Sequence, residues 1–142
     1  MVDGHRLPPP RPARGRLLVV AALAATIALG LASRRWPLPG LLAEHAGDAL
    51  YTVAVFWFLA LLAPTLAGLR LGGLAFLASA AVEFAQLLQW PWLVELRQHR
   101  LAALVLGQGF QWVDLTAYAI GALLATGLDA LLGRVGRRPA SG

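Results

Sequence analysis

The sequence predicts an all-α integral membrane protein with four transmembrane helices. Hydrophobic residues make up 58% of the 142 residues and charged residues only 13%, and long uncharged stretches alternate with short clusters of arginine. An ordinary soluble domain is only about 45–50% apolar. A bilayer core about 30 Å thick is crossed by roughly 20 mostly apolar helical residues. The chain is therefore long enough for a few such helices in one domain.

Four apolar stretches qualify, or nearly qualify, as spans; they cover residues 17–33, 48–69, 71–92 and 111–133. The first contains no ionisable residue. Pro64 is placed to kink the second near its end, because proline cannot donate the helical hydrogen bond. Arg70 leaves only a tight turn before the third span, so the second and third spans are predicted to form an antiparallel hairpin.

Basic segments flank the spans at both ends of the chain. Residues 1–16 are rich in proline and arginine and are predicted to be a disordered cytoplasmic tail, and residues 134–142 a second basic tail. A cleavable signal peptide ending near Ser33 is the alternative for the first span. The apolar run of this segment is longer than the apolar core of a signal peptide, which has roughly 7–15 residues, and this favours a span that is not cleaved off.

The distribution of arginine predicts the orientation, since all twelve cations are arginine. Eight lie in the two tails and at position 70, and four lie on the other side. This asymmetry places both termini in the cytoplasm. Four of the tryptophans fall near the predicted outer boundary, where such rings form a belt: Trp36, Trp90, Trp92 and Trp112.

The segment between the third and fourth spans does not fit a simple loop. Residues 101–106 are apolar but too few to cross a bilayer, and Gly107 and Gly109 interrupt any helix before the fourth span. Non-helical backbone at membrane depth needs cover from protein or from a wet cavity. We expect a short interfacial helix on the outer surface, with a re-entrant element as the alternative.

Ionisable side chains within spans are costly, about 2.5–3.5 kcal/mol at the helix centre, and therefore indicate a function or a partner. Glu83 is the clearest case, and helical spacing places Ser79 and Gln86 on its face. Asp114 and Tyr118 form a matching polar face at the start of the fourth span. Asp48, Tyr51 and Thr52 do the same at the start of the second.

All these groups fall in the predicted outer half of the membrane, so we expect them to form a carboxylate-rich pocket that opens outward. The cations nearest in sequence to this predicted pocket are Arg100 and Arg97, whose guanidinium groups can pair with its carboxylates. The predicted ligand-binding residues are Asp48, Tyr51, Glu83, Gln86, Arg100, Asp114 and Tyr118.

Structural roles compete with this interpretation. Asp48 and Asp114 could be helix caps, and Glu83 could form an interhelical hydrogen bond to Tyr51 or Tyr118. Gln86 and Ser79 could serve helix packing, and Arg97 and Arg100 could be solvated loop charges.

No pattern in the sequence predicts a catalytic residue, a metal site or a cofactor. Without cysteine, disulfide scaffolds and cysteine-ligated sites are excluded. Glu44, His45, Asp48 and His99 could hold a divalent ion, but their spacing matches no known metal motif. The basic tails are expected to meet anionic lipid headgroups, and we expect no nucleic-acid partner.

Three motifs resemble a family of small bacterial membrane proteins known as domain of unknown function 2809. They are Gly47-Asp48-Ala49-Leu50-Tyr51, Glu83-Phe84-Ala85-Gln86, and Gly107-Gln108-Gly109-Phe110 leading through Asp114 to Tyr118 and Gly121. The resemblance runs from about residue 30 to 132. It implies a multi-span protein of the bacterial inner membrane with no known activity.

A more distant likeness is to VanZ-like proteins, associated with teicoplanin resistance. The shared pattern falls on Asp48 with Tyr51, on Glu83 with Gln86, on Arg100, and on Asp114 with Tyr118 and Gly121. VanZ-like chains usually have asparagine where Tyr118 lies, and a histidine near the first aspartate that is not matched here. This likeness implies a role at the outer leaflet or cell envelope.

Two functional classes follow. The leading hypothesis is a non-enzymatic protein whose outward pocket binds an envelope ligand, such as a lipid headgroup or a cationic amphiphile. The alternative is a proton-coupled small-molecule transporter that uses Glu83, a class that usually works as homo-oligomers. An enzyme acting on lipid is a third hypothesis, but the sequence supplies no nucleophile for it.

Overall fold

The computed structural model describes residues 13–36, 39–107 and 109–135, apart from the side chains of residues 41–44. Within these ranges the chain forms helices and no strands. The helices are α1 (Arg16–Arg35), α2 (Leu41–Leu62), α3 (Gly68–Ala85), α4 (Pro91–Gln98), α5 (Arg100–Leu106) and α6 (Trp112–Val135). The greater part of each predicted tail, 1–16 and 134–142, lies outside the described residues.

Four of these helices, α1, α2, α3 and α6, are long and apolar enough to cross a membrane. Their outward surfaces carry large apolar side chains that are highly exposed, among them Leu17, Leu69 and Leu123. A soluble monomer rarely exposes so much contiguous apolar surface, and lipid is the solvent that suits it. The predicted fold class, four spans and shorter helices between the third and fourth, is confirmed.

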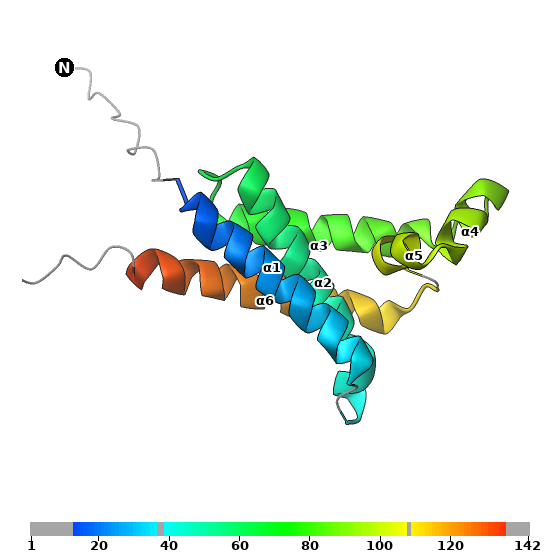
Figure 1. The fold of residues 1–142 in the computed structure, drawn as a ribbon. Coiled ribbons are helices and arrows are strands. Elements are labelled where there is room, and N and C mark those ends of the chain that lie inside the picture. The colour runs from blue at the N-terminus through cyan, green and yellow to red at the C-terminus, as the bar shows by residue number, and fades with distance from the viewer. Residues whose placement is uncertain (1–12, 37–38, 108, 136–142) are drawn as a thin grey trace, which may run out of the picture.

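Helix α2 is the centre of the bundle, because it packs against α1, α3 and α6, while α3 and α6 also pack against each other (Figure 1). Close approach is possible where glycine faces a neighbour. A Cβ at Gly121 of α6 would collide with the backbone of Ala49 in α2, and one at Gly72 of α3 would collide with Thr126 of α6. Small residues at such contacts are typical of helix packing in lipid.

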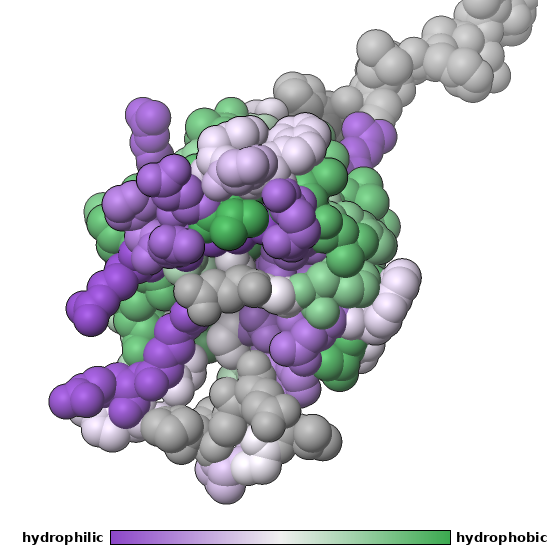
Figure 2. All heavy atoms as spheres, turned by 90° about the vertical axis from the view of Figure 1, so that its right-hand side faces the viewer, coloured by the Kyte–Doolittle hydropathy of each residue, from purple (hydrophilic) through white to green (hydrophobic). Residues whose placement is uncertain are grey.

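The interior of the bundle changes from apolar to polar along its length. Near the start of α1 and the end of α2, the core consists of apolar side chains such as Val19, Phe56, Trp57 and Leu71. Toward the end that carries α4 and α5, the buried side chains are polar: Thr52, Ser79, Glu83, Gln86 and Asp114. Figure 2 looks onto this second end, where hydrophilic side chains gather between apolar flanks.

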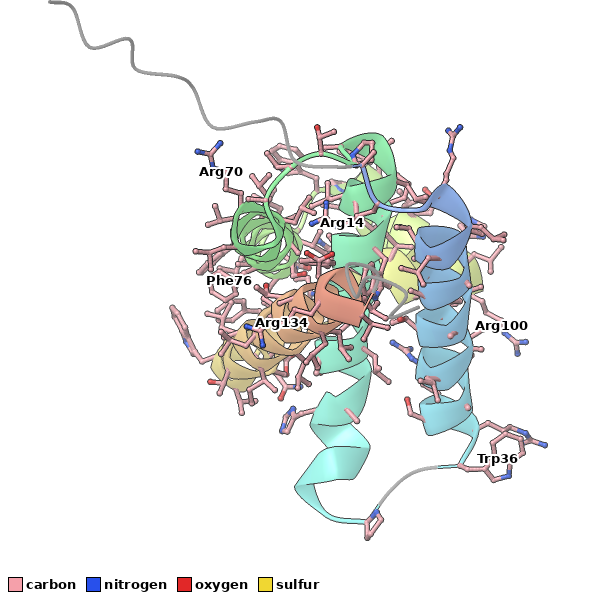
Figure 3. The ribbon with its side chains drawn as sticks, turned by 90° about the vertical axis from the view of Figure 1, so that its left-hand side faces the viewer. Arg14, Trp36, Arg70, Phe76, Arg100 and Arg134 are labelled. Atoms are coloured by element: carbon pink, nitrogen blue, oxygen red, sulfur yellow. The ribbon has the colours of Figure 1, made fainter. Side chains whose placement is uncertain are left out.

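Arg14 ties the opposite end of the bundle together. Its guanidinium donates to the backbone oxygens of Pro64 and Leu66, at 2.9 and 2.8 Å, and its Nη2 donates to Asp129 at 2.7 Å. Figure 3 shows Arg14 pointing in among the helices, whereas Arg70 points away from them. One side chain therefore links the segment before α1 to the α2–α3 connection and to α6.

The end of α2 differs from the sequence prediction for a local reason. Helix α2 ends at Leu62, so Pro64 lies in the connection to α3 and does not kink a span. Proline disfavours helix at the residue before it, and Ala63 accordingly leaves the helical region with φ −129° and ψ 70°. The tight turn predicted at Arg70 therefore falls earlier, and Arg70 itself is in α3.

Helix α3 ends at Ala85, whereas the third span was predicted to continue to residue 92. Arg97 explains the early end, because its guanidinium donates to the backbone oxygens of Ala85 and Leu88 at 2.7 and 3.1 Å. These carbonyls lie at the helix C-terminus and the turn beyond it, and a cation there also suits the helix dipole. Arg97 is thus buried as a cap of α3 and is neither a solvated loop charge nor a pocket residue.

Candidate functional site

A cavity of about 690 Å³ lies at the polar end of the bundle, among the end of α1, α2, the end of α3, α5 and the start of α6. This volume lies within the roughly 300–1,000 Å³ range of small-molecule sites. All seven sequence-predicted ligand-binding residues line it: Asp48, Tyr51, Glu83, Gln86, Arg100, Asp114 and Tyr118. The structure therefore brings together acids from three spans, while their ligand-binding role stays a prediction.

Glu83 is the most buried acid of this cavity, with 1% of its surface exposed. Its carboxylate accepts three hydrogen bonds: from the Tyr118 hydroxyl at 2.7 Å, from the backbone N–H of Gln111 at 2.6 Å, and from Gln86 Nε2 at 3.2 Å. The interhelical hydrogen bond to Tyr118 is one of the structural roles predicted for Glu83. The carboxylate thus joins α3, the loop before α6, and α6 itself.

Gln86 has a second polar atom that the protein leaves unsatisfied. The side chain is 7% exposed, and its Oε1 has no hydrogen-bond partner among the described residues. Gly107 is the residue that makes room for this amide, because a Cβ there would collide with it. Gly107 also has φ 66° and ψ 178°, a backbone conformation that is essentially limited to glycine.

Asp48 and Asp114 face each other across the α2–α6 contact together with His45. Nδ1 of His45 lies 3.4 Å from Oδ1 of Asp114, and one ligand atom each of His45, Asp48 and Asp114 lie within 4.8 Å of one another. Asp48 lies well inside α2, which begins at Leu41, so its predicted N-cap role is wrong.

A polar contact between α2 and α3 lies next to Tyr51 in sequence and one helical turn before Glu83. The Thr52 hydroxyl donates to the Ser79 hydroxyl at 2.9 Å, and both side chains are fully buried. The rings of Tyr51 and Tyr118 lie 6.3 Å apart at an angle of 52°. Ser79 therefore has the helix-packing role that was one of its two predicted roles. The two tyrosines form an aromatic pair beside the acids.

The cavity has arginines at its exposed edge and one apolar wall. Arg34, at the end of α1, and Arg100, at the start of α5, line it but are exposed. The Arg100 side chain points away from the helices (Figure 3) and forms no ion pair with a described acid, contrary to the predicted pairing. The apolar wall is the α5 segment Ala103–Val105 with Val82 of α3.

Sequence reasoning did not assign three contributors to the pocket, although it named His45 as a possible metal ligand with Asp48. His45 lies one helical turn before Asp48, a spacing that identifies it once α2 is known to begin before residue 48. Arg34 was assigned only to membrane orientation, because nothing in the sequence brings the end of α1 to this cavity. Gln111 contributes a backbone N–H, and no side-chain pattern signals such a donor.

The carboxylates of the cavity differ in how many hydrogen bonds the protein donates to them. The oxygens of Glu83 accept hydrogen bonds from protein groups, whereas Asp48 and Asp114 lie close together with His45 beside Asp114 and form no ion pair with an arginine among the described residues. Two carboxylates this close repel each other unless a cation or hydrogen-bond donors lie between them. The cavity is thus suited to a positively charged or donor group.

Comparison with known proteins identifies a family for most of the chain. The family model described as "Protein of unknown function (DUF2809)" matches residues 37–122, a range that includes α2 through the first part of α6. No solved structure matches the chain. The matched range contains every predicted ligand-binding residue, and it confirms the family resemblance seen in the three motifs. The likeness to VanZ-like proteins stays a prediction.

Proposed function

The chain belongs to the DUF2809 family of proteins of unknown function, and we propose that its cavity binds the polar headgroup of an envelope lipid or other amphiphile from the outer side of the membrane. The observation that carries the proposal is the cavity itself: it has acids on one wall, arginines at the edge and an apolar wall from α5. A ligand that is polar at one end and apolar at the other matches these surfaces.

The position of the cavity in the bundle supports a membrane ligand. It lies at one end of four apolar helices whose sides expose leucine and other large apolar residues. A headgroup at that depth would keep its acyl chains beside these apolar surfaces, so the ligand would not have to leave the lipid phase. Burial of apolar surface and charge-assisted hydrogen bonds would then both contribute to affinity.

The arginine distribution supports an outward-facing cavity. The end that carries the cavity is opposite the start of α1, the start of α3 and the end of α6. By sequence, eight arginines belong to the two tails and position 70 and only four to the cavity side, and the side with more arginine is usually cytoplasmic. The predicted belt residues Trp90, Trp92 and Trp112 are exposed beside the cavity end of α3 and α6. Both features favour a cavity that opens to the outer leaflet of the bacterial inner membrane.

Binding is favoured over the alternative, proton-coupled transport through Glu83. A coupling carboxylate must gain and lose its proton as the substrate moves. The Glu83 oxygens instead accept from Tyr118, Gln111 and Gln86, and this hydrogen bonding positions two helices and a loop. Such a role suits a scaffold of the binding site, with Asp48 and Asp114 as the groups that contact the ligand.

The test is a thermal-shift comparison in detergent micelles with three probes: phosphatidylglycerol, phosphatidylethanolamine and an alkyltrimethylammonium amphiphile. A ligand present at 100 times its Kd stabilises the folded protein by about 2.7 kcal/mol, which raises Tm measurably. We expect at least one probe to raise the Tm of the wild type. The Asp48→Asn variant should lose most of this shift.

The matched control is Glu95→Gln, which removes one carboxylate from the exposed surface of α4, outside the cavity. It should keep the shift of the wild type. No shift with any probe would contradict the proposal, as would a shift that Asp48→Asn and Glu95→Gln change equally.

A further inference from the structure

We infer that His45, Asp48 and Asp114 form a binding site for a divalent transition-metal ion in the wall of the cavity. The inference deepens the proposed function and rests on it for the location of the ligand, since it identifies the positive charge that the two aspartates require. The ion, and not the headgroup itself, would be the cation at the acids.

The geometry of the three residues suits a shared ion. Ligand atoms that are each about 2.1 Å from one ion lie at most ~4.2 Å apart. The His45–Asp114 pair, at 3.4 Å, already has such a spacing, and the three ligand atoms lie within 4.8 Å of one another. His45 and Asp48 are both half-buried, so their side chains have room for the small adjustment that closes the site.

The backbone fixes the positions of these ligands. His45 and Asp48 are one turn apart on the same face of α2, and α6 is held against that helix by the contact of Gly121 with Ala49. Asp114 is in the first turn of α6 and is 8% exposed. Two ligands from one helix and one from its packed neighbour form a site that exists before the ion binds.

Gln86 is an independent sign of a ligand in this cavity. Gln86 lines the cavity, and its Oε1 is buried and lacks a partner among the described residues, although a buried amide oxygen normally accepts a hydrogen bond. An acceptor is satisfied by a donor such as the water bound to a metal ion. A cation in the cavity would neutralise the aspartates, and its bound water is the kind of donor that Gln86 lacks.

The charge of the cavity also favours a divalent ion. Three carboxylates line it, from Asp48, Glu83 and Asp114, against the arginines Arg34 and Arg100. One divalent ion changes this balance from a net negative to a net positive charge. The cavity would then accept a headgroup phosphate, with the ion on one side and the arginines on the other.

The ligand set indicates which class of ion binds. One imidazole nitrogen with two carboxylates suits zinc and neighbouring first-row ions, whereas calcium and magnesium prefer oxygen ligands alone. Three protein ligands also leave a fourth position of a tetrahedral zinc ion open. Because all three residues line the cavity, water or a phosphate oxygen from the cavity would complete the coordination.

The experiment is isothermal titration of the full-length protein in detergent micelles with zinc chloride alone, after removal of metal with EDTA and buffer exchange. We expect one saturable site per chain and an affinity at least tenfold weaker for magnesium chloride. His45→Gln and Asp48→Asn should each weaken zinc binding at least tenfold. Circular dichroism and gel filtration establish that each variant is folded.

The chain has two other histidines, so the control is the double variant His5→Gln/His99→Gln, which should bind zinc like the wild type. Absence of saturable heat above a micelle blank would overturn the inference. So would zinc binding that His45→Gln and Asp48→Asn leave unchanged, or binding that only the double variant loses.

Lipid thermal shifts with and without EDTA separate this inference from the proposed function. Zinc binding without any lipid shift supports the metal site and contradicts headgroup binding. A lipid shift that EDTA does not change, in a protein that binds no zinc, supports headgroup binding and overturns the metal site.

Discussion

Replacing Glu83 tests whether this acid is a structural junction of the cavity. In Glu83→Gln, the amide oxygen can still accept from the Gln111 N–H, and the amide nitrogen can donate to Tyr118 and to a reoriented Gln86. The variant therefore loses mainly the charge assistance of these bonds. A hydrogen bond to a charged group contributes about 1.5–3 kcal/mol and a neutral one about 1 kcal/mol, a difference of about 0.5–2 kcal/mol for each bond. A neutral amide is cheaper to bury than a carboxylate, which offsets part of the loss, so we expect a net cost of about 1–2 kcal/mol.

Glu83→Leu removes the acceptor entirely and leaves three donors without it in a site where Glu83 is 1% exposed. Two of these donors, on Tyr118 and Gln86, are buried, and each buried unsatisfied donor costs about 1–3 kcal/mol, which predicts a loss of at least about 2 kcal/mol. The measurement is the free energy of unfolding in mixed detergent micelles. Glu95→Gln, on the exposed surface of α4, should change it by less than about 0.5 kcal/mol. Equal costs for the glutamine and leucine variants of Glu83 would refute the reasoning, as would a leucine variant as stable as Glu95→Gln.

Three further changes test other contacts by the same unfolding measurement. Gly107→Ala should lower the free energy of unfolding by about 1–3 kcal/mol, because φ is positive there and the new Cβ would collide with Gln86. A Cβ at Gly109 would meet open space, so Gly109→Ala should be near neutral, and equal effects of the two changes would contradict this reasoning. Arg97→Met should lower the free energy of unfolding by about 2–4 kcal/mol because it removes the cap of α3. Arg100→Met, on the exposed surface, should lower it little, and the reverse order would contradict the capping role. Asp129→Asn should cost about 1–3 kcal/mol because Arg14 loses its charged partner, and a variant as stable as the wild type would show that this pair does not hold the helices together.

The sequence predicted the spans and the polar end of the bundle because membrane insertion constrains both strongly. Long uncharged stretches identify helices in lipid, and an acid such as Glu83 within one must face protein. Helical spacing alone placed Gln86 on the face of Glu83, and Asp48, Glu83 and Asp114 do line one cavity. Their common location in one half of the membrane was the signal that predicted the pocket.

Other features depend on tertiary contacts that no local pattern encodes. Helix α3 ends at Ala85 because Arg97, twelve residues later, caps it. The backbone N–H of Gln111, just before α6, donates to Glu83 near the end of α3, a contact between residues 28 positions apart in the sequence. His45 was considered with Asp48 only as a possible metal ligand and not as a pocket residue, because the second span was expected to begin at Asp48, whereas α2 begins two turns earlier.

The measurement that tests the central claim most directly is chemical cross-linking from outside the cell. The natural chain has no cysteine, so Asp48→Cys/Asp114→Cys introduces the only two thiols. A short, membrane-impermeant bifunctional methanethiosulfonate added to intact cells should join them, as detected by mass spectrometry, and should not join Asp48→Cys/Asp129→Cys. No cross-link under any condition would show that the two acids do not converge, and a cross-link only in opened membranes would show that the cavity faces the cytoplasm.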